Sequence, residues 1–251
     1  MINRNSDELN KIKSFTRKDD LPIKSQFKLS VNTVLNMIKL HNPQEIEKIL
    51  QMNLYTFQEL KGIVEEGVVL STIKARYDKI IKRLTKLEYI NENGITRLGD
   101  FTTNIFSNEI EVSQIFYGEN KFELDEYLIL LLLGAMDYEE RKDTKFFNTF
   151  MTKKISRLEH KLLDHPVIKR FKWPKYLEPL TAIIQPVYYQ KGFLEIMKNS
   201  NLVEGDIIRF LLRIMDKLEQ ISRATDDGRM RSMVDNCKEL IRKCLEGIQV
   251  F

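Results

Sequence analysis

The stretch from Glu204 to Thr225, EGDIIRFLLRIMDKLEQISRAT, has the strongest helical pattern in the chain. Its apolar residues recur at intervals of three and four, which predicts a long amphipathic helix. After Asp227-Gly228, residues 230–250 repeat this pattern and predict a second long helix. Because the connection between the two is short, we expect an antiparallel helical hairpin.

The composition of the chain favours a mainly α-helical protein. Of its 251 residues, 43% are apolar and 30% charged, which allows a sizeable buried core. Only 10 Gly and 6 Pro are present, which argues against collagen-like, low-complexity and turn-dense all-β architectures. With 40 Lys and Arg against 36 Asp and Glu, the net charge is +4, so the chain is only mildly basic.

Residues 30–108 show an order of elements that is typical of a winged-helix module. A helix begins near Val31, a second follows the Asn42-Pro43 cap, and a third is capped by Thr56. A long basic helix comes next, and its end is followed by a β-hairpin with Asn93-Gly94 at the turn. The helix DFTTNIF is then expected to pack back on this module.

The flanking parts complete the predicted organisation. Residues 1–29 are polar without a clear period and predict a linker or the tail of a preceding domain. Residues 109–251 predict an α-helical bundle, in which four prolines break the region 166–190 into short helices.

The sequence contains no recognisable catalytic motif. None of the glycines belongs to a GxxxxGK[ST] or GxGxxG loop, and neither HExxH nor GxSxG occurs. We therefore expect no catalytic residue, no cofactor site and no metal site in this chain. His160 and His165 flank a polar stretch and fit a solvated surface pair better than a pair of metal ligands.

Apolar runs and cysteines indicate an intracellular protein, cytoplasmic or nuclear, without a membrane partner. The longest apolar run, Leu128–Leu133, is far below the roughly 20 residues that cross a bilayer, and predicts a buried helix instead. The N-terminus lacks the apolar block of a secretory signal. Cys237 and Cys244 lie on one face of a helix, and we expect buried thiols rather than a disulfide.

Two constellations are candidates for nucleic-acid contact. The first is the basic helix from Lys74 to Lys86, whose lysines fit either a DNA-contacting helix or an ordinary solvated face. The second is the long helix after Gly205, where four polar residues at steps of four, three and four share one face: Arg209, Arg213, Asp216 and Gln220. Guanidinium groups bind phosphates or stack on bases, so this face fits a single strand as well as plain solvent.

Three stretches share motifs with a known family. Residues 25–58 are similar to the pattern SxFxLxYNMxLNL, which is followed by an FQ pair. Residues 87–106 are similar to a LGYID–TxKGR segment. The first pattern is met by Ser25, Phe27, Leu29, Asn32, Leu35, Asn36, Phe57 and Gln58. Residues 193–221 contain EGxIIR, met by Glu204, Gly205, Ile207, Ile208 and Arg209. Together these stretches resemble the C-terminal region of the superkiller-type DExH-box RNA helicases, which feed the RNA exosome.

This resemblance implies a winged helix followed by a DSHCT helical domain, in which a ratchet helix, residues 206–225, runs under the nucleic-acid channel. Arg209, Arg213 and Gln220 are then expected to contact single-stranded RNA or DNA. The resemblance also implies a RecA-like helicase core as partner, in cis or in trans. ATP and Mg²⁺ are expected only in that core, so the chain alone should lack the ATPase activity of the whole helicase.

The chain departs from the family pattern at several places. Only a short segment separates Phe57-Gln58 from the hairpin, so the arch insertion of the eukaryotic exosome helicases is absent. Val31 and Thr33 replace a Tyr and a Met, and Leu98 and Asp100 replace the Lys and Arg of the KGR motif. The last change weakens any phosphate contact near the hairpin.

Three other functions remain open at the level of sequence. A winged-helix DNA-binding regulator requires the Lys74–Lys86 helix to be open to solvent. A protein-interaction scaffold requires an exposed apolar groove and a face at Arg209 and Arg213 that is covered or paired with carboxylates. A DNA-repair helicase of the same superfamily would use the same ratchet mechanism, and the sequence does not distinguish a strand with ribose from one with deoxyribose.

Overall fold

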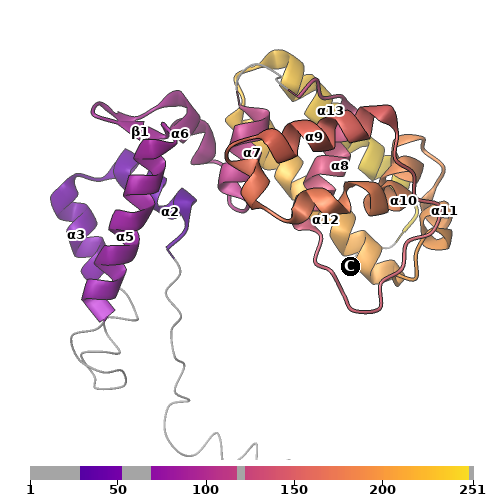
Figure 1. The fold of residues 1–251 in the computed structure, drawn as a ribbon, viewed down its shortest axis with the longest axis horizontal. Coiled ribbons are helices and arrows are strands. Elements are labelled where there is room, and N and C mark those ends of the chain that lie inside the picture. The colour runs from indigo at the N-terminus through magenta and orange to yellow at the C-terminus, as the bar shows by residue number, and fades with distance from the viewer. Residues whose placement is uncertain (1–28, 53–68, 118–121, 249–251) are drawn as a thin grey trace, which may run out of the picture.

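The computed structural model describes residues 29–52, 69–117 and 122–248, and it is mainly α-helical, as the sequence predicts. The elements form two groups that lie next to each other along the long axis of the molecule (Figure 1). The smaller group contains α2 (Val31–Leu40), α3 (Pro43–Gln51), α5 (Val69–Lys86), β1 (Ile90–Asn91), β2 (Gly94–Ile95) and α6 (Arg97–Thr102).

The larger group follows α6 and consists of helices. Its members are α7 (Glu109–Phe116), α8 (Glu126–Asp137), α9 (Lys153–Asp164), the 3-10 helices η1 (Ile168–Arg170) and η2 (Trp173–Tyr176), α10 (Leu177–Tyr188), α11 (Phe193–Lys198), α12 (Glu204–Ala224) and α13 (Gly228–Leu245). The predicted lead-in, the Thr56-capped helix and four residues of the family pattern lie outside the described residues. These four are Ser25, Phe27, Phe57 and Gln58.

Local capping explains where α2 and α3 begin. The Ser30 hydroxyl accepts a hydrogen bond from the Thr33 amide at 3.0 Å and starts α2. At α3, Asn42 and Glu45 form a reciprocal capping box around Pro43, each side chain accepting from the backbone amide of the other at 3.0 Å. The predicted Asn42-Pro43 start is confirmed.

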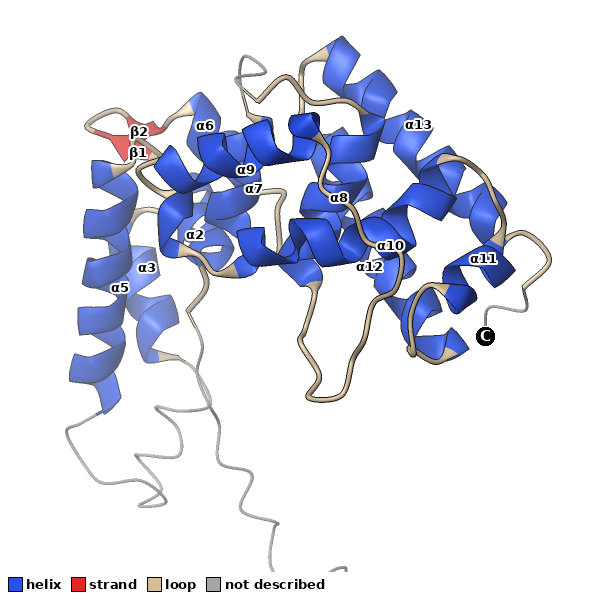
Figure 2. Ribbon diagram, turned by 45° about the vertical axis from the view of Figure 1, so that its right-hand side comes forward, coloured by secondary structure: helices blue, strands red, loops and turns tan. Residues whose placement is uncertain are grey.

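The hairpin exists where it was predicted, but its turn is shifted by one residue. Ile90 pairs with Ile95 and Asn91 with Gly94, which leaves Glu92 and Asn93 in the loop. The Asn91 side chain accepts a hydrogen bond from the Asn93 amide at 2.9 Å, so an Asx turn replaces the predicted Asn93-Gly94 turn. Gly94, with φ at +103°, then enters the second strand. Figure 2 shows the hairpin at the end of α5.

Asparagines of the family pattern fix α2 against the end of α6. The side-chain amides of Asn32 and Asn36 both donate to the carbonyl oxygen of Thr103, at 2.6 and 3.2 Å. This carbonyl lies just past the last turn of α6, where backbone acceptors lack helical partners. Asp100, in place of the family's Arg, forms an ion pair with Lys39 of α2. The motif residues thus have a structural task in this chain.

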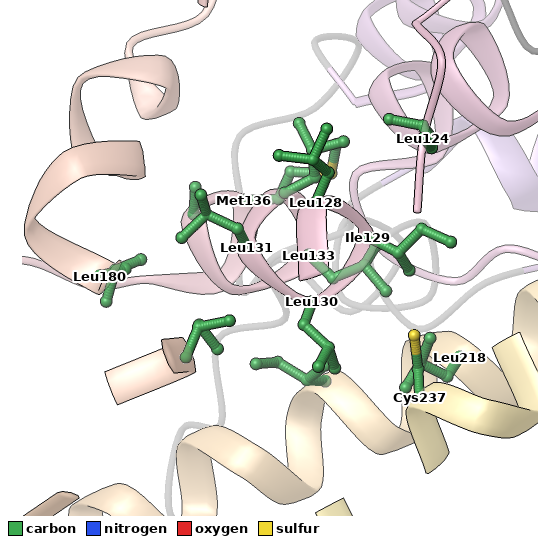
Figure 3. Packing of buried hydrophobic residues seen from close by; sticks show 14 of the residues in the cluster. Leu124, Leu128, Ile129, Leu130, Leu131, Leu133, Met136, Leu180, Leu218 and Cys237 are labelled. Atoms are coloured by element: carbon green, nitrogen blue, oxygen red, sulfur yellow. The ribbon is translucent and has the colours of Figure 1, made fainter. Parts of the chain in front are cut away.

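The buried helix α8 is the centre of the larger group. Its residues 128–136 are all buried, so this helix has no polar face, as the apolar run predicts. Figure 3 shows Leu180 of α10, Leu218 of α12 and Cys237 of α13 around it. None of the described helices is both long and apolar enough to span a membrane. Cys237 and Cys244 are buried free thiols, which confirms their prediction.

The region 166–190 is less broken than the prolines predict. Residues 177–188 form one continuous helix, α10, with Pro186 inside it. A proline at this position cannot donate to the carbonyl of Ala182. The side chain of Asn199, beyond α11, donates to this carbonyl at 3.0 Å and replaces the missing bond. The short 3-10 helices η1 and η2 confirm the prediction over residues 168–176, but it was wrong for residues 177–188, because the compensating donor is distant in sequence.

The predicted antiparallel hairpin of α12 and α13 is confirmed. The two helices join through a short turn, and Asp227 caps α13 by accepting from the Arg229 amide at 2.8 Å. Lys238 of α13 reaches back to Glu219 of α12 at 2.9 Å. The apolar face of α12 packs against α8 and α13, which leaves its polar side to face the end of α8 and the loop that follows it.

Candidate nucleic-acid interface

A cleft of about 590 Å³ opens beside the first half of α12. Its walls are α12, the end of α8 with the loop after it, and Ser107 from the connection between α6 and α7. The charged residues that line it are Asp137, Glu139, Arg141, Asp206, Arg209, Arg213, Asp216 and Lys217. Four cations and four carboxylates therefore share one cleft, and Tyr138 adds an aromatic ring.

Arg209 lies on the rim of this cleft in a fixed orientation. Its Nε donates to the carbonyl oxygen of Gly205 at 3.1 Å, and its Nη2 donates to Asp206 Oδ1 at 3.3 Å. The side chain is still 74% exposed. A guanidinium carries five N–H donors, and these two bonds are the ones it makes within the described residues, so three donors remain for a ligand.

Arg213 lies one turn further along α12 and lines the same cleft. Its Nη1 contacts Glu139 Oε1 at 3.4 Å, and the two side chains are 46% and 85% exposed. Exposed ion pairs of this kind contribute about 0 to 1 kcal/mol. A nucleic-acid group that approached the cleft would therefore displace Glu139 at small cost. The structure brings Arg209 and Arg213 together, as their spacing predicts.

Lys217 belongs to the same cleft but is locked into the fold. Its side chain is 2% exposed, and its ammonium forms an ion pair with Asp137 of α8 at 2.8 Å. It also donates to Ser107 Oγ at 2.9 Å and to Asn108 Oδ1 at 2.5 Å. Burial raises the pKa of Asp137 above its ordinary value, and Lys217 opposes this shift. The four groups join α8, α12 and the α6–α7 connection.

Gln220 is placed differently from the two arginines. It is 5% exposed, and its Oε1 accepts from the Phe106 amide at 2.8 Å while its Nε2 donates to Asp216 at 2.7 Å. Its amide therefore holds the α6–α7 connection on α12. Contact between Gln220 and nucleic acid stays a prediction, and it would require both of these hydrogen bonds to be exchanged.

A comparison with protein families identifies the part of the chain that contains the cleft. The model of the DSHCT (NUC185) domain matches residues 92–245, more than half of the chain. The chain belongs to the DSHCT family. This domain is found in helicases of the superkiller type. A search of curated proteins finds no match to the chain.

The DSHCT match covers every residue that lines the cleft. It begins at Glu92, inside the hairpin, and ends at Leu245, the last residue of α13. Helices α2, α3 and α5 precede it, so the winged helix predicted over residues 30–108 stays a prediction, as does its boundary at residue 108.

The EGxIIR residues of this sequence, Glu204 to Arg209, form the first turns of α12. Gly205 supplies the carbonyl that orients Arg209, and a Cβ built on it would lie 3.9 Å from Arg209 Nη2, an ordinary contact. Glu204 and Asp206 are acidic residues in the first turn, where they interact favourably with the helix dipole. Ile207 is buried and anchors the turn in the core.

Outside the DSHCT match, α5 presents its basic side chains to solvent. The exposed cations are Lys74, Arg76, Lys79, Lys82, Arg83 and Lys86. The opposite side of α5 packs on α2 and α3 through Ile73 and Leu84. Among the described residues, no cluster of His, Cys, Asp and Glu is arranged to hold a metal ion.

Sequence reasoning missed two of the four cations that line the cleft, Arg141 and Lys217. Arg141 lies in a loop without periodicity, so no pattern singled it out. Lys217 follows Asp216 on α12, and its burial depends on Asp137, a distant residue. Lys217 shares a helical face with the apolar Phe210, Ile214 and Ile221, and a lysine on such a face was the available signal for a buried ion pair.

Proposed function

We propose that this chain is the nucleic-acid-guiding C-terminal region of an ATP-dependent RNA helicase, and that it holds single-stranded RNA against the first half of α12. The observation that carries the proposal is the pair of exposed guanidinium groups, on Arg209 and Arg213, that lie one helical turn apart on a cleft. The occurrence of the DSHCT domain in superkiller-type helicases supports it.

In this proposal the chain contributes contact and no chemistry. A RecA-like core, in cis or in trans, binds ATP and Mg²⁺ and moves the RNA. Arg209 and Arg213 hold bases or phosphates between steps, because guanidinium groups stack on bases and bind phosphates bidentately. The rigid rod of α12 keeps the two contacts at a constant spacing, which hinders slippage of the strand.

The charge balance of the cleft shapes the expected binding. Four carboxylates and four cations line the cleft, so it has no net positive charge that would attract every polyanion. We expect the arginines to contact bases and riboses as well as phosphates. For single strands, each phosphate contact contributes about 0.7 to the slope of log affinity against log salt. A shallow salt dependence is therefore expected.

The direct test is binding of a fluorescent single-stranded oligouridylate, measured by anisotropy at low and high salt. Arg209→Ala/Arg213→Ala should lower the affinity by about tenfold or more, because each specific arginine contact is worth roughly 1 to 3 kcal/mol. The matched control is Arg229→Ala/Arg242→Ala, which removes the same charge from exposed positions on α13. This control should bind within about twofold of the unmodified chain.

Equal binding by both double variants would contradict the proposal. A DNA oligonucleotide of matching sequence separates the two helicase classes. Preference for RNA supports the RNA helicase, whereas equal affinity supports a DNA-repair helicase of the same superfamily.

The second candidate is a winged-helix regulator that binds duplex DNA, and the solvent-exposed basic face of α5 favours it. In this case Lys79→Gln/Lys82→Gln should weaken binding of duplex DNA and reduce its salt dependence. The Arg209→Ala/Arg213→Ala variant should then bind duplex DNA like the unmodified chain.

A further inference from the structure

One carboxylate in the cleft joins two guanidinium groups that come from different elements. Asp206 accepts from Arg141 Nη1 at 2.5 Å and from Arg141 Nη2 at 3.0 Å, which is a bidentate pair. The same Asp206 accepts from Arg209 Nη2 at 3.3 Å. Its side chain is 11% exposed, whereas those of Arg141 and Arg209 are 62% and 74% exposed.

The loop that carries Arg141 is tied to the segment just before α12. Asn201 donates from Nδ2 to the Asp143 carbonyl at 2.7 Å and accepts at Oδ1 from the Lys145 amide at 2.8 Å. The backbone of Phe146 bridges to Ser200. The position of Arg141 beside α12 is therefore set by backbone pairing as well as by its ion pair. Figure 1 shows this long loop between α8 and α9.

Both guanidinium groups keep N–H donors that Asp206 does not occupy. Within the described residues, Arg141 uses two of its five N–H donors on this carboxylate and Arg209 uses one there and one on Gly205. A shared, nearly buried carboxylate thus fixes two exposed guanidinium planes relative to each other. Side chains fixed in this way lose little rotational entropy when a ligand binds.

We propose that Arg141 is a third strand-contacting residue, which holds the nucleic acid from the loop side of the cleft. Asp206 is then a positioning residue that holds the guanidinium groups of Arg141 and Arg209 in a fixed relative orientation. This inference rests on the proposed function of Arg209 and Arg213, and adds a residue from outside α12 to it. The ligand is the same single strand, held between a helix and a loop.

The test compares two adjacent positions in the loop. Arg141→Ala and Lys142→Ala each remove one positive charge from neighbouring exposed residues, but only Arg141 lines the cleft. With a single-stranded oligouridylate and the full chain, Arg141→Ala should weaken binding by about five- to tenfold. Lys142→Ala should change it by less than about twofold. Thermal unfolding of both variants checks that the fold is retained.

Asp206→Asn distinguishes positioning from net charge by the sign of its effect. If Asp206 acts only as a negative charge near a polyanion, its removal should tighten RNA binding. If Asp206 positions two arginines, its removal should weaken binding, even though the cleft becomes more positive. Arg141→Lys, which keeps the charge but loses the bidentate geometry, should bind more weakly than the unmodified chain.

The outcomes separate this inference from the proposed function. Equal binding by Arg141→Ala and Lys142→Ala, with a strong loss in Arg209→Ala/Arg213→Ala, overturns the role of Arg141 alone. Tighter binding by Asp206→Asn overturns its positioning role. Unchanged binding by Arg209→Ala/Arg213→Ala overturns the proposed function, and this inference with it.

Discussion

The two halves of α12 each carry polar residues three or four positions apart and use them in opposite ways. In the first half, Arg209 and Arg213 are exposed: Arg209 keeps N–H donors beyond those it uses on Gly205 and Asp206, and Arg213 makes a weak contact with Glu139 that a ligand can replace. In the second half, Lys217 and Gln220 are buried, and each makes hydrogen bonds to the α6–α7 connection. The first half is open to a ligand and the second half holds the fold together.

The two halves differ because a segment distant in the sequence covers only the second half of α12. The periodicity of α12 places its polar residues on one side, but it carries no information on which of them face solvent. The α6–α7 connection, more than 100 residues earlier in the chain, lies over the second half through Ser107, Asn108 and Phe106. The cleft begins where this connection ends.

The largest expected effect is on the closed half, in Lys217→Met. This change leaves Asp137 as a buried carboxylate without its counter-ion, and breaking such a pair costs about 3 to 5 kcal/mol. Urea unfolding at neutral pH measures the loss. The control Arg223→Met removes an exposed pair with Glu219 and should cost less than about 0.5 kcal/mol. Equal losses would mean that Lys217 does not lock the fold.

The loss in Lys217→Met should depend on pH. Burial already raises the pKa of Asp137, and removal of the ammonium raises it further. Because the pKa of Asp137 is higher in the folded than in the unfolded chain, its protonation favours folding. This contribution to stability is fully present below the pKa of the unfolded chain and is lost as the pH rises through the pKa of the folded chain. The destabilisation should therefore shrink as the pH is lowered from neutral into the range in which Asp137 is protonated. A loss that is independent of pH would contradict this explanation.

A smaller effect is expected for Gln220→Ala. The Phe106 amide loses its acceptor at 2.8 Å; because this bond is only partly buried and Phe106 itself is exposed, we expect the net loss of a typical hydrogen bond, about 0.5 to 1.5 kcal/mol. RNA affinity, corrected for the folded fraction, should stay within about twofold if Gln220 acts only on the α6–α7 connection. A large loss of affinity without loss of stability would instead show that Gln220 contacts the strand directly.

The elements of this fold could be predicted where local chemistry decides them. The Asn42 cap, the apolar run at Leu128–Leu133 and the periods of α12 and α13 each specify their helix within a few residues. Helix α10 could not be predicted, because the bond that Pro186 removes is replaced by Asn199 from beyond α11. Such a compensation is set by tertiary contact and leaves no local signal.

The candidate site was predictable to a similar extent. The convergence of Arg209 and Arg213 follows from their spacing on one helix. The contribution of Arg141 does not, because its place is fixed by loop pairing with Asn201 and by a shared Asp206. The burial of Gln220 depends on the α6–α7 connection, which no pattern in α12 reveals.

Photo-crosslinking to thiouridine-substituted single-stranded RNA, followed by mass spectrometry of the digested full chain, tests the central claim most directly. If the open half of α12 and its facing loop hold the strand, adducts should map to residues 138–141 and 204–213, and adduct yield should fall in Arg209→Ala/Arg213→Ala. Adducts concentrated on α5, or unchanged in that variant, would contradict the account.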